Sequence, residues 1–297
     1  MNMLRLLSIA LFALLSATTV MAQPDLLVEA LRSYQSGELM KARLLVDEAV
    51  ETPAHSQDPE AWLLRGFIYK DLFKGMPQGT EADKIRDEAM NSLVNSLNLD
   101  EAGTYRDNAV QAYDYLTRSC FNEAAKSLSE SQEQRAMDLF GQFKRATLRR
   151  DPGADLKAKE VEFHNALGTV LTKRFNQDRE DTTWFFKAVE AYQEVMKLEP
   201  ENYGANYNLA TLYYNRGVFE IRAIKAEDDI PTIQQIQEAS KEYFQKALPY
   251  MLKAHELNPN RRETLLGLEG IYYSLQDTVN SDKFRELYEM MPPQNDQ

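Results

Sequence analysis

The stretch that most constrains the fold is 200–217, PENYGANYNLATLYYNRG, which follows a segment ending in KLEP. It places Asn206, Leu209, Ala210 and Tyr213 at offsets of three, one and three residues, so the four side chains share one face of a helix. Ala210 is small, and a small residue in such a face lets a second helix come close. The spacing therefore predicts a helix that buries these four residues, or nearly so, against a partner helix.

Related patterns recur along the chain and predict pairs of helices. Trp62, Gly66 and Tyr69 repeat the pattern of a first helix. Two other segments carry the pattern of a second helix and end at a proline: Ala188, Tyr192 and Val195 before Pro200, and Ala247, Met251 and Ala254 before Pro259. Glycine (12 residues) and proline (11 residues) are scarce, and no stretch sustains a period of two, so we expect no sheet.

These pairs resemble tetratricopeptide repeats, in which Trp, Leu-Gly and Tyr mark the first helix and Ala, an aromatic, Ala and Pro mark the second, over 34 residues. The resemblance implies an all-α fold, an irregular right-handed superhelix of antiparallel helix pairs (a TPR-like α-solenoid). We expect about five to six pairs in residues 23–291 and a polar tail at 292–297. Pro152 and Pro200 are 48 residues apart, and Pro200 and Pro259 are 59 apart, so some pairs must contain longer helices or loops.

Several local features predict how individual helices begin and pack. The acidic segments 178–181 and 227–229 are predicted helix starts. Ala112 and Tyr115 are expected to face inward in the third pair (residues 101–160), the pair expected to deviate most. Ser129 and Gln132 are a predicted capping box for the helix that follows. Pro249 is expected to kink a long helix, because it removes a backbone donor.

Residues 1–22 are predicted to be a cleaved signal peptide. One charge, Arg5, precedes an apolar run, and small residues lead to Ala22 before Gln23. The run is short for a membrane span of about 20 residues, although an uncleaved anchor is the alternative. Removal of Arg5 would change the net charge from −12 to −13. The signal peptide predicts export, and an exported chain with a single cysteine, Cys120, forms no disulfide within itself. We therefore expect a bacterial protein, most simply periplasmic, with secreted or envelope-associated forms as alternatives.

The composition also excludes several classes of function. The acidic balance argues against nucleic acid as a partner. The three histidines are far apart and lack ligand spacing, and no nucleophile elbow, phosphate-binding glycine loop or HExxH motif occurs. We therefore expect neither an enzyme nor a bound cofactor or metal, and no membrane span once the signal peptide is removed.

The resemblance implies binding of peptides or helices in a concave face lined by first helices. In this family a basic residue and asparagines can clamp a terminal carboxylate there, and Asn165 and Lys173 match that clamp while Thr169 replaces its second Asn. The candidate groove residues are Asn165, Thr169, Lys173, Arg174, Tyr207, Thr211, Tyr214 and Asn215. The competing interpretation is a solvated polar helix face, since such residues are common on surfaces.

Three functions remain open. The leading one is an exported scaffold that binds peptide or helix segments of envelope proteins. A second is a structural component that self-assembles through its end pairs. A third is glycan binding through surface tyrosines, which are dense: one ring of Tyr272 and Tyr273 is expected inside and the other outward.

Overall fold

The computed structural model describes residues 25–292, which form helices joined by short connections, with no strand in that range. The leader expected at 1–22 lies outside the described residues, as does nearly all of the predicted tail. The chain divides into two compact units, 1–116 and 117–297, and the boundary falls within α6 (Arg106–Ser129). Each unit has a hydrophobic core of its own.

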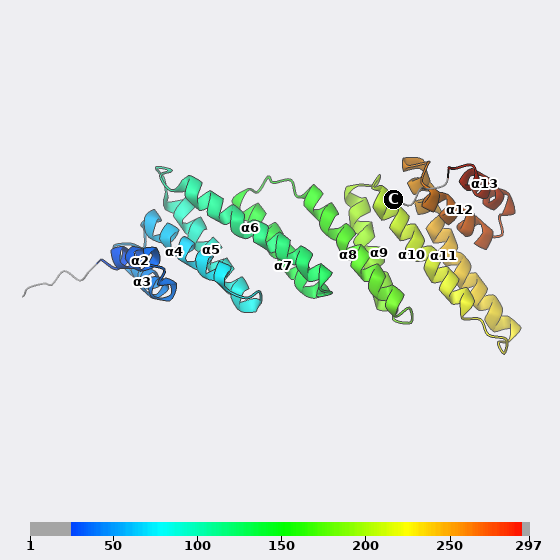
Figure 1. The fold of residues 1–297 in the computed structure, drawn as a ribbon, viewed down its shortest axis with the longest axis horizontal. Helices are drawn as coiled ribbons and strands as arrows, with labels where there is room; N and C mark the ends of the chain where they lie inside the picture. The colour runs from blue at the N-terminus through cyan, green and yellow to red at the C-terminus, as the bar shows by residue number, and fades with distance from the viewer. Residues whose placement is uncertain (1–24, 293–297) are drawn as a thin grey trace, which may run out of the picture. The chain divides into compact units, whose positions relative to one another are not determined.

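The remaining helices follow in chain order (Figure 1): α2 (Leu26–Gln35), α3 (Leu39–Glu51), α4 (Pro59–Gly75), α5 (Thr80–Leu99), α7 (Glu133–Arg150), α8 (Lys157–Gln177), α9 (Thr182–Leu198), α10 (Tyr203–Arg222), α11 (Ile230–Leu257), α12 (Arg262–Ser274) and α13 (Thr278–Glu289).

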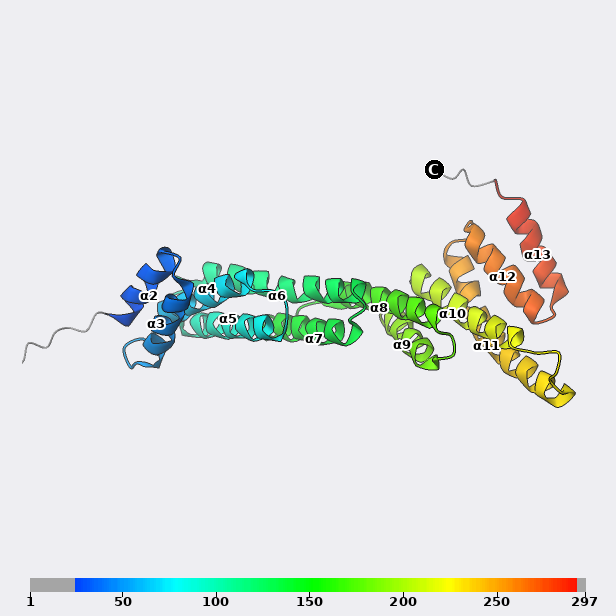
Figure 2. The ribbon, with the colours of Figure 1, turned by 60° about the horizontal axis from the view of Figure 1, so that its bottom comes forward.

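Consecutive helices pack as antiparallel pairs, seen within each unit in Figures 1 and 2: α2 with α3, α4 with α5, α8 with α9, α10 with α11, and α12 with α13. The second helix of a pair also packs on the first helix of the next pair, as α9 packs on α10. First helices of neighbouring pairs are in contact as well, as α8 is with α10. This packing order is that of a helical-repeat array, so the prediction of an all-α fold built from antiparallel pairs is confirmed. The handedness of a superhelix stays a prediction.

Asparagine and aspartate caps fix where many of these helices begin. The Asp181 carboxylate accepts a hydrogen bond from Thr183 N, and the Asp229 carboxylate accepts one from Thr232 N. These bonds satisfy backbone donors that the first turn of a helix leaves free. The two acidic segments are therefore helix starts, as the sequence predicts.

Small residues set the distance between the helices of a pair. A Cβ added to Gly66 in α4 would lie 2.6 Å from Cδ2 of Leu93 in α5. A Cβ added to Gly217 in α10 would lie 2.6 Å from Cε1 of Phe244 in α11. Each glycine thus lets a large side chain of the partner helix touch the backbone, which is the role that the repeat pattern assigns to a small residue in this face.

The residues that defined the opening stretch lie largely where expected. Leu209 and Ala210 are fully buried and Asn206 is 3% exposed. Asn206 Nδ2 donates to the carbonyl oxygens of Pro200 (3.0 Å) and Asn202 (2.9 Å), which ties the loop to α10. Tyr213 is half-buried and stacks on Tyr250, with 6.2 Å between ring centroids.

Two predictions for the third pair are wrong. Tyr115 is 41% exposed, whereas Tyr113 is buried, because Ala109, Ala112, Tyr113 and Leu116 form the inward face. Ser129 is the last residue of α6, where its hydroxyl donates to Lys126 O, and Gln132 precedes α7 without a side-chain cap bond. The expected capping box is therefore absent at this turn.

The pair α10–α11 is the longest described pair. Its helices have 20 and 28 residues, against 13 and 12 in α12 and α13, and α11 is one continuous helix through Pro249. At about 1.5 Å per residue, α10 is about 10 Å longer than α12. The far end of this pair consequently extends past the turn between α12 and α13 (Figure 2). Among residues 25–292, no helix combines the length and apolar character that a membrane crossing requires.

Candidate functional site

The predicted groove residues of α8 differ in their availability. Thr169 donates its hydroxyl hydrogen to the carbonyl of Asn165 (2.9 Å), one turn earlier in the same helix. Lys173 is exposed and forms no ion pair with residues 25–292. Arg174 is engaged inside the unit, since its Nη2 donates to Ser131 O (2.9 Å) and its Nε lies 2.7 Å from Oε1 of Glu133.

The predicted groove residues of α10 are all half-buried. The Tyr207 ring stacks on Tyr203, with centroids 5.9 Å apart, and burial raises the pKa of its hydroxyl. The Tyr214 ring packs against Phe244, with centroids 5.7 Å apart, and its hydroxyl lies against Gly270 of α12. Tyr214 therefore has a packing role between α10, α11 and α12. Whether any of these residues binds a partner stays a prediction.

A cavity of about 470 Å³ opens where this face of α10 continues. Val218 and Arg222 follow Tyr214 at successive intervals of four residues, which is one turn of helix each, and both line the cavity. The lining comes from α10, α11, α12, the turn after α12 and the first residue of α13: Val218, Ile221, Arg222, Phe244, Tyr273, Ser274, Gln276 and Thr278. The face that the sequence marked as a binding surface thus leads into a cavity.

The unequal lengths of the helix pairs explain why this space is unfilled. α10 and α11 continue past the end of α12, so α12 does not cover their side chains at that level. Phe244 is buried against Gly217, and Tyr273, at the last turn of α12, is 70% exposed. A buried aromatic ring and an exposed one therefore bound the same cavity, which leaves an apolar wall open to solvent.

The lining contains one charged residue, Arg222, and no acid. Arg222 is exposed and makes no hydrogen bond or ion pair within residues 25–292. The Ser274 hydroxyl donates to Gly270 O (2.8 Å) in its own helix. The cavity thus presents apolar surface, one unpaired guanidinium and the side chains of Gln276 and Thr278.

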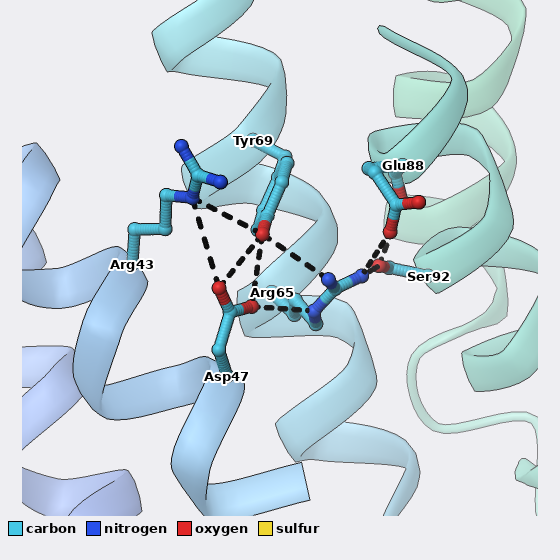
Figure 3. A network of polar contacts seen from close by, with 6 residues as sticks. All are labelled: Arg43, Asp47, Arg65, Tyr69, Glu88 and Ser92. Carbon is cyan, nitrogen blue, oxygen red and sulfur yellow. Dashed lines mark hydrogen bonds and ion pairs between the residues drawn. The ribbon is translucent and has the colours of Figure 1, made fainter. Parts of the chain in front are cut away.

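A second polar cluster lies in unit 1 and joins three helices (Figure 3). Its members are Arg43 and Asp47 of α3, Arg65 and Tyr69 of α4, and Glu88 and Ser92 of α5. Arg65 is central, because its Nε donates to Asp47 Oδ1 (2.8 Å) and its Nη1 donates to Ser92 Oγ (2.7 Å). The hydroxyl of Tyr69 donates to Asp47 Oδ2 (2.8 Å).

The pKa shifts in this cluster follow from burial and pairing. Burial lowers the pKa of Arg65, but Tyr69 and Asp47 more than offset this, so its pKa lies above its ordinary value. Burial and then the bond to Asp47 raise the pKa of the Tyr69 hydroxyl. Both residues therefore keep their usual protonation state, and their polar atoms form hydrogen bonds within the cluster. We interpret the cluster as a structural link between α3, α4 and α5.

The prediction from the sequence did not include the lining residues that follow Gly217. The helical periodicity could have identified them, because the spacing of three and four residues that links Tyr207, Thr211 and Tyr214 continues to Val218 and Arg222. One ring of Tyr272 and Tyr273 was expected to point outward: Tyr273 is 70% exposed, while Tyr272 stacks on Phe284 with 5.7 Å between centroids. Residues 25–292 contain no group of three or more His, Cys, Asp or Glu placed to hold a metal ion.

Comparison with known proteins adds little to this description. No protein-family model matches the sequence, and no curated protein matches it either. A solved structure of a monomeric mutant of IFIT1 with Gppp-AAAA is similar in fold, with a TM-score of 0.38 and 13% sequence identity. The match covers 86% of this chain and 47% of that chain, so this chain spans about half the length of that protein. The fold assignment rests on the packing order of the helices.

Proposed function

We propose that this chain is an exported scaffold that binds a segment of a protein partner, and that the cavity at the end of α10 takes the segment's anchoring side chains. The observation that carries the proposal is the continuation of the predicted binding face, through Val218 and Arg222, into an apolar cavity. Sites for small ligands are typically cavities of about 300–1,000 Å³ with apolar walls and a few polar groups, and anchoring side chains at protein interfaces fill pockets as well. The volume and lining described here lie within that class.

The proposed location is the bacterial envelope, most simply the periplasm. The support is the sequence of residues 1–22, with one charge, an apolar run and a small residue before Gln23. Mass spectrometry of the protein recovered from a cell fraction tests this directly. A mature chain that begins at Gln23 in the periplasmic fraction is expected, and an intact leader in the cytoplasmic fraction would reject the proposal.

The binding proposal is tested by filling the cavity. Val218→Trp places a large ring in the cavity, whereas Leu266→Trp places the same ring on an exposed position of α12 outside the lining. After cross-linking in cells, affinity isolation from envelope extract should recover the same partner with wild type and Leu266→Trp, and lose it with Val218→Trp. Recovery that does not change with Val218→Trp, at equal thermal stability, would exclude this cavity as the anchor.

One observation favours the rival function, self-assembly through an end pair. The first pair exposes large apolar side chains, with Met40 59% and Leu44 69% exposed in α3. Terminal units of repeat arrays usually present a polar outer face, so this surface favours association. Light scattering over a concentration series tests it: concentration-dependent dimers that Leu44→Glu abolishes would favour self-assembly, and a constant monomer would exclude it.

A further inference from the structure

We infer that the cavity at the end of α10 selects an acidic and apolar protein segment, in which a carboxylate lies beside the apolar side chain that enters the cavity. The inference rests on the proposed function and specifies the chemistry of its partner.

The apolar part of this partner follows from the walls. Val218, Ile221, Phe244 and Tyr273 supply half of the eight lining residues, and Ile221 and Tyr273 are 40% and 70% exposed. Covering exposed apolar surface is favourable by roughly 25 cal/mol per Å². An aromatic or branched aliphatic side chain gains this energy at the cavity, whereas a polar side chain does not.

The carboxylate follows from Arg222. Its guanidinium is the one charge in the lining, and it has no partner within residues 25–292. Guanidinium groups bind carboxylates in a two-pronged geometry that suits a protein interface. A cation beside an apolar wall should therefore bind an acidic partner more tightly than a basic one.

None of the acids near this end of α10 forms an ion pair with Arg222, and all but the exposed Glu227 are engaged elsewhere. Glu220 forms an ion pair with Arg216, one turn earlier in α10. Asp228 accepts a hydrogen bond from Lys225 N (2.8 Å), and Asp229 caps α11. On a chain of net charge −12, this leaves a cationic opening beside an apolar wall, complementary to a segment of the opposite charge.

The shape of the site favours a protein segment over a small molecule. The stripe from Tyr207 through Thr211 and Tyr214 to Arg222 spans 16 residues of α10, about 22 Å of helix, and carries no acid. Because Tyr214 packs against α12 within this stripe, a bound segment would contact the exposed Ile221, Arg222 and Tyr273 at the mouth of the cavity and place one side chain inside it. A short fatty acid would share the chemistry of the cavity but would cover less of this exposed surface.

The experiment uses mature full-length protein in which the methyl groups of valine and isoleucine are labelled for NMR. Two nine-residue Gly/Ser peptides carry Phe-Asp-Phe or Phe-Lys-Phe at their centre, and octanoate is the third probe. The Phe-Asp-Phe peptide is expected to shift the Val218 and Ile221 signals in a saturable manner and to bind about two- to fivefold more tightly than Phe-Lys-Phe, the range for one partly exposed ion pair.

Two variants test the role of the charge. Arg222→Gln should abolish the preference between the peptides, and Arg222→Glu should reverse it. Lys187→Gln removes an exposed cation of α9 outside the lining and should leave the preference unchanged. Thermal unfolding of each variant verifies that the fold is intact.

The outcomes separate this inference from the proposed function. Equal binding of both peptides at Val218 and Ile221 would overturn the acidic preference while leaving the cavity as an anchor. Binding of octanoate alone would overturn the protein segment in favour of a small amphipathic carboxylate. If no probe shifts these signals, the inference and the proposed anchor both fail.

Discussion

Gly168 of α8 lies directly against the ring of Tyr192 in α9. A Cβ on Gly168 would be 2.6 Å from Cε1 and 2.7 Å from Cζ of that ring. Tyr192 is 1% exposed, so the ring is held by its surroundings and cannot move aside without disturbing the core. The distance between α8 and α9 therefore depends on the absence of a side chain at position 168.

Gly168→Ala should consequently destabilise the protein, although alanine has the higher helix propensity. Overpacking of a close-packed core costs about 1–3 kcal/mol, and urea unfolding followed by circular dichroism measures the loss. Gly204→Ala in α10 is the matched control, because a Cβ there would have an ordinary 3.5 Å contact with Asn202. That variant should be as stable as wild type or more so. Equal stabilities for both variants would show that the helices separate at no cost.

Removing Asp47 should destabilise the first unit. Asp47→Ala leaves the Nε–H of Arg65 and the hydroxyl of Tyr69 without their acceptor, and Tyr69 is 2% exposed. Loss of charge-assisted hydrogen bonds of this kind costs about 1.5–3 kcal/mol, measurable by urea unfolding. Lys84→Ala breaks the exposed ion pair with Glu81 and should change stability by less than about 0.5 kcal/mol. A loss as small for Asp47→Ala would contradict the linking role of the cluster.

Tyr34 should make stability sensitive to high pH. Its hydroxyl donates to Asp71 Oδ2 (2.6 Å), and burial followed by this bond raises the pKa of Tyr34 well above its ordinary value. The unfolded chain loses this proton near pH 10, so the contribution of Tyr34 is present below pH 10 and is lost as the pH rises toward the folded-state pKa.

The comparison with Tyr34→Phe isolates this effect. The variant should be less stable than wild type by about 1 kcal/mol at pH 8, because the bond to Asp71 is missing. Above pH 10 the difference in stability between wild type and Tyr34→Phe should narrow by up to about 1.4 kcal/mol per pH unit. Tyr69 and Tyr105, whose hydroxyls also have a raised pKa, are present in both proteins and cancel. A stability difference that stays constant from pH 8 to 11.5 would argue against the shift.

Arg174 and Lys173 are neighbours in sequence but should differ in role. Arg174 contacts Ser131 and Glu133, and its guanidinium lies 4.7 Å from the centre of the Trp184 ring. Arg174→Ala should therefore lower stability by about 1 kcal/mol and change the fluorescence of Trp184. Lys173→Ala should leave both unchanged and weaken partner binding only. Equal effects of the two substitutions on stability would contradict this division.

Much of the fold could be predicted because packing residues recur at helical spacing. The positions of Leu209 and Ala210 follow from local pattern alone, and both are fully buried. The prediction for Tyr115 is wrong because two tyrosines, Tyr113 and Tyr115, follow Ala112 closely. A spacing of three selects Tyr115, whereas the burial of Ala109 and Leu116 sets the phase that selects Tyr113.

The site could be predicted only in part. The face of α10 follows from periodicity, but the cavity depends on how far one helix pair extends past the next, which no local pattern encodes. Arg174 illustrates the same limit, because its partners lie more than 40 residues earlier in the chain, in the turn before α7 and at its first residue. Helical spacing identifies which side chains share a face, and tertiary packing decides which of them remain free.

Pro249 has a consequence for how α11 opens. Proline carries no backbone N–H, so it donates no hydrogen bond to the carbonyl of Gln245 one turn earlier. One backbone hydrogen bond of the helix is therefore missing at that point. The ten residues before Ser240 include no buried side chain, whereas Ala247, Met251 and Ala254 after it are buried. Amide hydrogens of residues 234–239 should therefore exchange with solvent far sooner than those of 250–257, through local fraying that leaves the rest of the unit folded.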